Sequence, residues 1–331
     1  MLLSSPAELI SGLPPFVFRE KTVQRLEPQG WDKPVIWFHG PDGTRVSVEV
    51  MAKQGFVTAN FPGAQLLTRR YSHTDRKAMM VSLLTEAAGY RWEGTLTRAP
   101  AAKVPEVAKD HWWQIARDAG GQYFNAKGGS ERFIFYEATA FQEPVVSAKV
   151  TAEAITIRNT YDAPTGQVIV LVNAPDKHYV RVVDTIGANA ELQLGKDEIL
   201  KGSCSAESVL AACAGQWTSF GMTEPEGKAI AAVWREDLLK SNRFLLISRM
   251  PVRLYDAMFP LNITPSPGEL VRVGLVFDAM DRQSGAASWL PLRQDIQQAV
   301  AKAASGLGND DWKKRDQASE ELARLGNQGR A

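Results

Sequence analysis

Residues 133–136 read Phe-Ile-Phe-Tyr, and this run constrains the fold more than any other stretch of the chain. Alternate side chains of a strand point to opposite faces, so the two phenylalanines would lie on one face and the isoleucine and tyrosine on the other. Both faces are then apolar, which predicts a strand covered by packed layers on both sides. Glu137 follows directly and would share the face of the phenylalanines.

Short stretches of strand length, separated by turn residues, fill most of the first 200 positions. They lie at 35–38, 45–50, 55–61, 90–97, 150–158, 167–172, 178–184 and 190–194. The stretch at 45–50 alternates valine with polar residues, which predicts one buried and one wet face. Because the turn sequence Pro41-Asp42-Gly43 separates it from 35–38, we expect these two strands to form a hairpin. Such regularly spaced short strands are typical of a β-sandwich-like antiparallel core.

The rest of the chain mixes helices with strands. Thr223 and Glu226 have the spacing of a capping box and predict the start of a helix, whereas three prolines mark 259–269 as an extended loop. Further strands are predicted at 243–248 and 271–277, and further helices at 288–305 and 312–325. We therefore predict an α+β fold. It comprises a lead-in at 1–30, a sandwich-like domain at 31–200, an α/β segment at 201–285 and a helical tail at 286–331.

Composition narrows the classes of function. The net charge is +1, whereas nucleic-acid binding needs a basic excess, so we expect no nucleic-acid partner. No apolar run approaches about 20 residues, so we expect no membrane-spanning segment. The N-terminus lacks a signal-peptide pattern and by itself predicts a cytoplasmic protein, or one whose export signal is gone. Cys204 and Cys213 should be free, buried thiols, because nine helical steps span about 13 Å and a disulfide needs Cα atoms within about 7 Å.

No motif of a known catalytic class occurs in the sequence. Phosphate-binding glycine loops, a nucleophile elbow and a zinc-binding histidine pair are all absent. The four histidines share no ligand spacing, so we expect no metal site, and nothing points to a cofactor. Arg249, Arg253 and Arg272 could bind an anion, but their alternation favours one solvated face.

Glu137 has two possible roles. A carboxylate at the rim of an aromatic core could have a raised pKa and act as a general acid or base. The favoured alternative is structural: the side chain reaches solvent or pairs with Arg132, Arg117 or Lys127, because an unpaired buried carboxylate costs several kcal/mol. We also weigh His39 with Asp42 as an acid–base pair against a local turn hydrogen bond.

Aromatic residues supply the remaining candidates. Trp112 and Trp113 could line a sugar-stacking groove, but without a polar cluster nearby we prefer a place in the core. Arg132 and Tyr136 flank the apolar run and are candidate binding residues.

Three stretches resemble an uncharacterised group of bacterial proteins from planctomycete- and myxobacterium-like genomes, often predicted to be exported. KPVIWFHG with VSVEV and GFVTANFPGA is similar to the group's PVIYFY pattern, and ERFIFYEA is similar to EKFLFYRG. GMTEPEGKAIAAVW and FPLNITPSPGELVRVGLV are similar to its helix followed by an LPL-x-I-x-P-x-P…VRV pattern. The resemblance implies a periplasmic or secreted, β-rich protein and assigns no catalytic residue. Glu137 stands where the pattern has arginine.

The tail sequence DDWKKRDQASEELARLG is similar to the opening helix of HEAT-like repeats. One helix cannot form a solenoid, so the tail is either a truncated repeat or a docking helix. Our leading expectation is a non-enzymatic, envelope-associated or secreted protein that binds a protein or glycan partner or serves a structural role. The alternatives are a carboxylate-dependent hydrolase-like enzyme and a subunit of a larger assembly.

Overall fold

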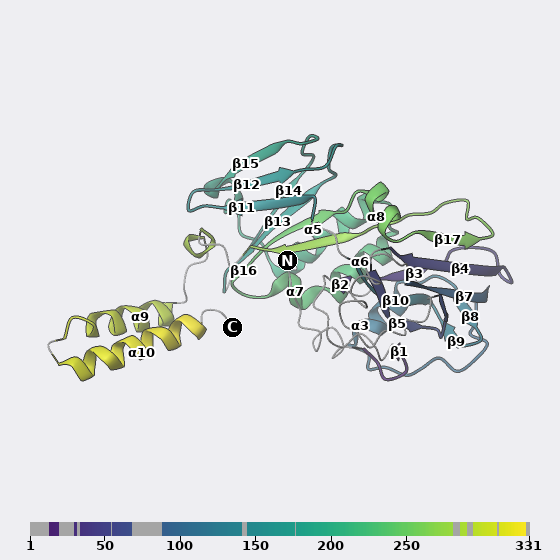
Figure 1. Ribbon diagram of the computed structural model, residues 1–331, viewed down its shortest axis with the longest axis horizontal. Coiled ribbons are helices and arrows are strands. Elements are labelled where there is room, and N and C mark those ends of the chain that lie inside the picture. Colours follow the sequence, from purple (N-terminus) through teal and green to yellow (C-terminus); the bar gives the residue numbers. More distant parts are fainter. Residues whose placement is uncertain are drawn as a thin grey trace, which may run out of the picture.

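The computed structural model describes residues 13–19, 30–31, 34–53, 55–67, 88–140, 144–175, 177–280, 285–289, 294–309 and 311–328. Helices and antiparallel sheets both contribute, which confirms the predicted α+β class (Figure 1). Within these residues no helix is long and apolar enough to cross a membrane.

The first sheet is built around β10 (Phe133–Ala140). Its other members are β1 (Phe18–Arg19), β2 (Gly30–Trp31), β3 (Val35–Trp37) and β5 (Gly55–Phe61). β10 is buried on both faces, as predicted: Ile134 and Tyr136 enter one hydrophobic cluster, and Phe133 and Phe135 enter another. The second cluster is closed by α3 (Trp112–Asp118), which contributes the fully buried Trp113.

The second sheet faces the first across a shared core. It contains β4 (Arg45–Ala52), β6 (Gln65–Leu67), β7 (Ala88–Thr97), β8 (Tyr123–Ala126), β9 (Gly129–Glu131) and β17 (Leu261–Thr264). In β4 the valines are buried and the alternating polar residues are half-buried, which confirms the predicted two faces. Trp92 and Tyr90 of β7 fill the space between the sheets, together with Val48 and Val50.

The predicted hairpin between 35–38 and 45–50 is wrong. β3 pairs with β10, whereas β4 pairs with β7 and β17, so the turn carries the chain from one sheet to the other. The turn itself is present: Thr44 N donates to Pro41 O, and Gly43 has a φ of 80° that favours glycine. The residues at 41–43 correctly predicted a turn, but they did not determine which strands pair.

A third sheet occupies the centre of the remaining chain. It is formed by β13 (Val168–Asn173), β14 (His178–Val183), β16 (Arg243–Arg249) and β18 (Leu275–Ala279). The strands predicted at 167–172 and 178–184 are confirmed, and they pair with each other. Helices α5 (Ala206–Ser219), α6 (Glu224–Val233) and α7 (Arg235–Leu239) pack on one face. A small sheet of β11 (Val146–Val150), β12 (Ala154–Asn159) and β15 (Glu191–Gly195) packs on the other.

Two sheets cross the predicted boundary at residue 200. β13 pairs with β16, and β4 pairs with β17, so each of these sheets combines strands from before and after that position. The lead-in at 1–30 is also more than a surface segment, because β1 pairs with β5 and Val17 is buried in the cluster around Phe133. Much of that lead-in lies outside the described residues.

Smaller elements differ from the prediction at their ends. The predicted loop at 259–269 contains β17, and the strand predicted from 271 begins at Leu275. The predicted strand 150–158 is two strands, β11 and β12. The remaining elements are α4 (Lys196–Ile199), α8 (Val252–Met258), the 3-10 turn Ala286–Ser288, α9 (Gln294–Gly306) and α10 (Trp312–Gln328). Figure 1 shows α9 and α10 side by side and apart from the sheets.

Both cysteines are free thiols, as predicted. Cys213 lies in α5 and is fully buried, and this burial raises its pKa to about 12. Cys204 is half-buried and its sulfur lies 3.5 Å from the carbonyl oxygen of His178. Burial also raises the pKa of Cys204, so neither thiol is activated as a nucleophile.

Candidate functional site

A cleft of about 1010 Å³ lies between the first two sheets and the helix-covered third sheet. One wall is the continuous segment 34–41, which includes β3, and the opposite wall is the continuous segment 265–278, which runs into β18. Helix α6 contributes Ile230, and Trp234 follows it. The walls are mainly apolar, and a few polar groups project between them, which is the usual composition of a ligand site.

A buried aromatic and basic cluster forms one part of the cleft. The guanidinium of Arg272 pairs with the carboxylate of Asp256, donates from Nη2 to Phe259 O at 2.8 Å, and lies 4.4 Å from the ring centre of Tyr255. Burial raises the pKa of Tyr136 well above its ordinary value, and its interaction with Tyr255 raises the pKa further. Tyr136 therefore stays protonated at neutral pH and can donate a hydrogen bond, but it cannot act as a base.

A histidine and a carboxylate meet in another part of the cleft. His39 Nε2 lies 2.9 Å from Glu226 Oε1. The second carboxylate oxygen, Oε2, accepts a hydrogen bond from Thr223 N at 2.8 Å, which completes the predicted capping box of α6. The side chain of His39 is 54% exposed and that of Glu226 is 10% exposed, so a ligand in the cleft can reach the imidazole more easily than the carboxylate.

Neither alternative weighed for His39, a pair with Asp42 or a local turn hydrogen bond, is formed among the described residues. Asp42 Oδ1 instead accepts a hydrogen bond from Arg98 N at 2.8 Å and so holds the turn against the end of β7. His39 reaches across to α6, which lies far away in the sequence. Sequence spacing favoured the local partner, but the turn geometry uses Asp42 for backbone contact.

Glu137 lies outside the cleft, on the face of β10 that carries Phe133 and Phe135. It is buried, and its Oε2 accepts a hydrogen bond from Thr58 Oγ1 at 3.1 Å. The pairing register between β10 and β5 shifts at Glu137 and Ala138, so the carboxylate stands at an irregularity in the sheet. The position is structural, but Glu137 is buried and does not reach solvent, and its predicted partner Arg117 pairs with Glu131 instead.

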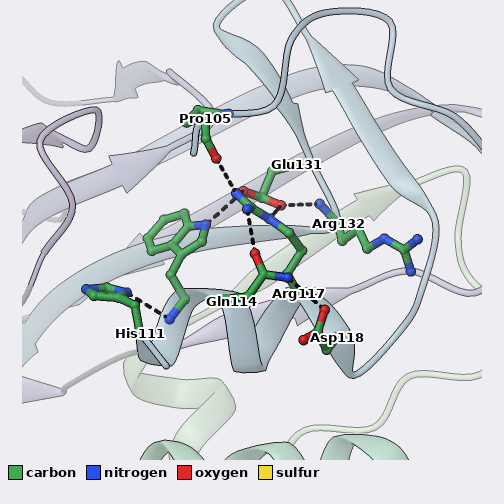
Figure 2. Close-up of polar contacts among 8 residues, drawn as sticks. Pro105, His111, Gln114, Arg117, Asp118, Glu131 and Arg132 are labelled. Carbon is green, nitrogen blue, oxygen red and sulfur yellow. Dashed lines mark hydrogen bonds and ion pairs between the residues drawn. The ribbon is translucent and has the colours of Figure 1, made fainter. Parts of the chain in front are cut away.

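Arg117 and Glu131 form a buried ion pair. Figure 2 shows the guanidinium of Arg117 among Glu131, Gln114 and the carbonyl of Pro105. Arg117 Nη2 donates to Glu131 Oε2 at 2.6 Å and Nε donates to Glu131 Oε1 at 2.9 Å. Trp113 Nε1 also donates to Glu131 Oε2, at 2.7 Å. Arg117 thus serves Glu131 through a two-point contact that fixes α3 against β9.

The other sequence candidates also belong to this structural region. Trp113 is fully buried, and Trp112 is half-buried with its ring centre 5.7 Å from that of Phe135, so the preferred place in the core agrees with the contacts of both tryptophans. Arg132 lies with its guanidinium carbon 4.9 Å from the ring centre of Tyr123. Of the candidates named from the sequence, His39 and Tyr136 line the cleft.

Three residues of the cleft were not predicted as site residues. Glu226 was interpreted only as a helix cap, Tyr255 gave no signal, and Arg272 was placed on a solvated face although its side chain is 8% exposed. Only the spacing of Thr223 and Glu226 could have pointed here, because the other contacts join distant parts of the chain. Throughout the described ranges, no group of three His, Cys, Asp or Glu side chains could hold a metal ion.

No protein-family model, curated protein or solved structure matches the chain.

Proposed function

We propose that the chain is a non-enzymatic binding protein and that the cleft between its two halves holds the partner. The observation that carries this proposal is the composition of the cleft: apolar walls from α6 and from 265–278, with polar groups fixed by partners within the chain. Fixed polar groups among apolar walls give orientation and specificity to a bound molecule. The near-neutral net charge favours a protein or glycan partner over a nucleic acid.

The chemistry of the cleft favours binding over catalysis. The raised pKa of Tyr136 makes its hydroxyl a hydrogen-bond donor at neutral pH, and Glu137 lies outside the cleft lining. The contact between His39 and Glu226 is the one observation that favours the hydrolase alternative, since a histidine held by a carboxylate can transfer protons. That alternative is our second candidate, with Glu226 in place of Glu137.

The proposal also includes a cellular location, a sandwich-like architecture and an alternative role in an assembly, each supported by one observation. A periplasmic or secreted location rests on the motif resemblance alone. The facing of the first two sheets across one core supports a sandwich-like description of this half. The exposed Trp312 at the start of α10 is the feature that would serve the alternative role of an assembly subunit.

Binding in the cleft can be tested with the dye 1-anilinonaphthalene-8-sulfonate as an apolar probe. Leu270 is 49% exposed in the cleft wall, so Leu270→Glu should leave the fold intact and place a charge in the site. We expect the wild-type chain to bind the dye and the variant to bind it at least about tenfold more weakly, because the new carboxylate repels the sulfonate of the dye and makes the apolar wall polar.

Leu66→Glu is the matched control. Leu66 is 41% exposed on β6 and does not line the cleft, so this variant should bind the dye like the wild type. Equal dye binding by all three proteins, or no binding by the wild type, contradicts the proposed use of the cleft.

A further inference from the structure

β3 presents one unpaired edge to the cleft. In its antiparallel ladder with β10, Tyr136 N donates to Pro34 O, and Ile36 lies opposite Ile134. Because inward and outward backbone groups alternate, the N–H and C=O groups of Val35 and Trp37 point away from β10. These outward groups have no hydrogen-bond partner among the described residues.

β18 presents a second unpaired edge. Met250 N donates to Gly274 O and Met280 N donates to Phe244 O, so the even-numbered residues of β18 face β16. The backbone groups of Leu275 and Phe277 therefore point outward. Within the ranges that the structure covers, nothing pairs with them either.

β17 presents a third unpaired edge. Met51 N donates to Pro260 O, which places Asn262 opposite Glu49 as a hydrogen-bonded pair. Leu261 and Ile263 then point their backbone groups away from β4, and no described group accepts or donates to them. All three edges belong to different sheets.

These three edges open into the same cleft. The six outward residues are Val35, Trp37, Leu261, Ile263, Leu275 and Phe277, and all of them line it. Each of these residues is half-buried, so none of them is sealed inside a hydrophobic core. An unpaired strand edge is a template for another strand, and proteins normally cover it or keep it short.

We propose that the partner held in the cleft is an extended polypeptide segment that pairs as an added strand with the edge of β18, while the edges of β3 and β17 lie open in the same cleft; this inference rests on the proposed binding function. Outward groups repeat along a strand at every second residue, about every 6.6 Å, and an extended peptide carries complementary donors and acceptors at the same repeat. Main-chain hydrogen bonds then supply affinity, and the apolar walls select the side chains.

The residues that line the cleft also indicate which side chains a bound peptide should carry. Alternate side chains of the added strand would meet Ile230, Trp234 and Met222, which favours apolar residues at every second position. The exposed residue Glu269 lines the cleft, whereas Glu226 is held by His39 and the guanidinium of Arg272 is paired with Asp256. We therefore expect lysine or arginine beside the apolar positions.

The test uses a phage-displayed library of random linear peptides, selected on the full chain and followed by binding measurements on synthetic peptides. Leu275→Pro removes one outward N–H but no ladder bond to β16, and proline is tolerated at such edge positions. We expect it to weaken binding of a selected peptide about threefold to tenfold, the value of one hydrogen bond. Leu275→Ala is the control for the loss of the leucine side chain.

N-methylation along the peptide gives an independent measurement that needs no change in the protein. We expect binding to be lost at every second peptide residue, the period of a strand ladder. A selected peptide with no such period, or no peptide selected at all, overturns the inference. Binding of soluble oligosaccharides in place of peptides also overturns it. If the dye binds and peptides do not, the binding function stands without a peptide ligand; if neither binds, both proposals fail.

Discussion

The carboxylate of Glu226 makes two different contacts, one with each of its oxygen atoms. One carboxylate oxygen caps α6 through Thr223 N, and the other holds His39 at 2.9 Å in the cleft. The capping task is visible in the sequence, because it depends on spacing within one turn. The contact with His39 cannot be predicted from the sequence, because it joins positions 187 residues apart.

The buried ion pair of Arg117 and Glu131 should dominate the electrostatic stability of the first half. Glu131→Gln keeps the size of the side chain but leaves the Arg117 charge without its partner at 10% exposure. We expect the free energy of unfolding in denaturant to fall by about 3 kcal/mol.

The same substitution at a half-buried pair is the control. Glu49 binds Arg91 at 2.7 Å, with side chains 26% and 40% exposed, so Glu49→Gln should cost less than about 1 kcal/mol. Equal losses in the two variants would show that burial of the Arg117 pair does not matter.

For helices and strands, local sequence patterns predicted where an element lies better than they predicted which strands pair. The alternation in β4, the capping box of α6 and the two apolar faces of β10 were all readable from the sequence, because each depends on neighbours along the chain. The sequence did not show which partner each strand pairs with. β3 and β4 flank the predicted turn yet belong to different sheets, because β3 pairs with β10, which lies far away in the sequence.

β17 shows the same limit for a short edge strand. Prolines 260 and 265 flank it and predicted a loop, but the four residues between them pair with β4. Proline is compatible with the ends of an edge strand, because its missing N–H is not needed there. The cleft depends on this strand, so sequence patterns alone could not have located the site.

At the scale of the whole molecule, the two halves are joined by more than one crossing of the chain. β17 pairs with β4 in the second sheet, although along the chain it lies between β16 and β18 of the third sheet. The cleft lies where these halves meet, which explains why the contact between His39 and Glu226 does not follow from local sequence. The helices α9 and α10 stand outside this arrangement (Figure 1).

The helical tail should therefore be dispensable for stability. We expect a chain that ends at Trp289 to unfold at the same temperature as the full chain, measured by circular dichroism. A chain that ends at residue 284 should lose about 3 kcal/mol or more, because Trp289 is 2% exposed and its Nε1 donates to Thr151 O at 2.6 Å. An equal loss in both truncated chains would show that α9 and α10 stabilise the sheets.

The central claim is that strand edges facing the cleft are open to another strand, and amide hydrogen exchange measured by NMR on the free chain tests it most directly. Val276 and Asp278 bond to β16 and should exchange slowly, whereas Leu275 and Phe277 point into the cleft and should exchange much faster. Slow exchange at all four amides would show that the edge of β18 is already covered, and strand addition in the cleft would be contradicted.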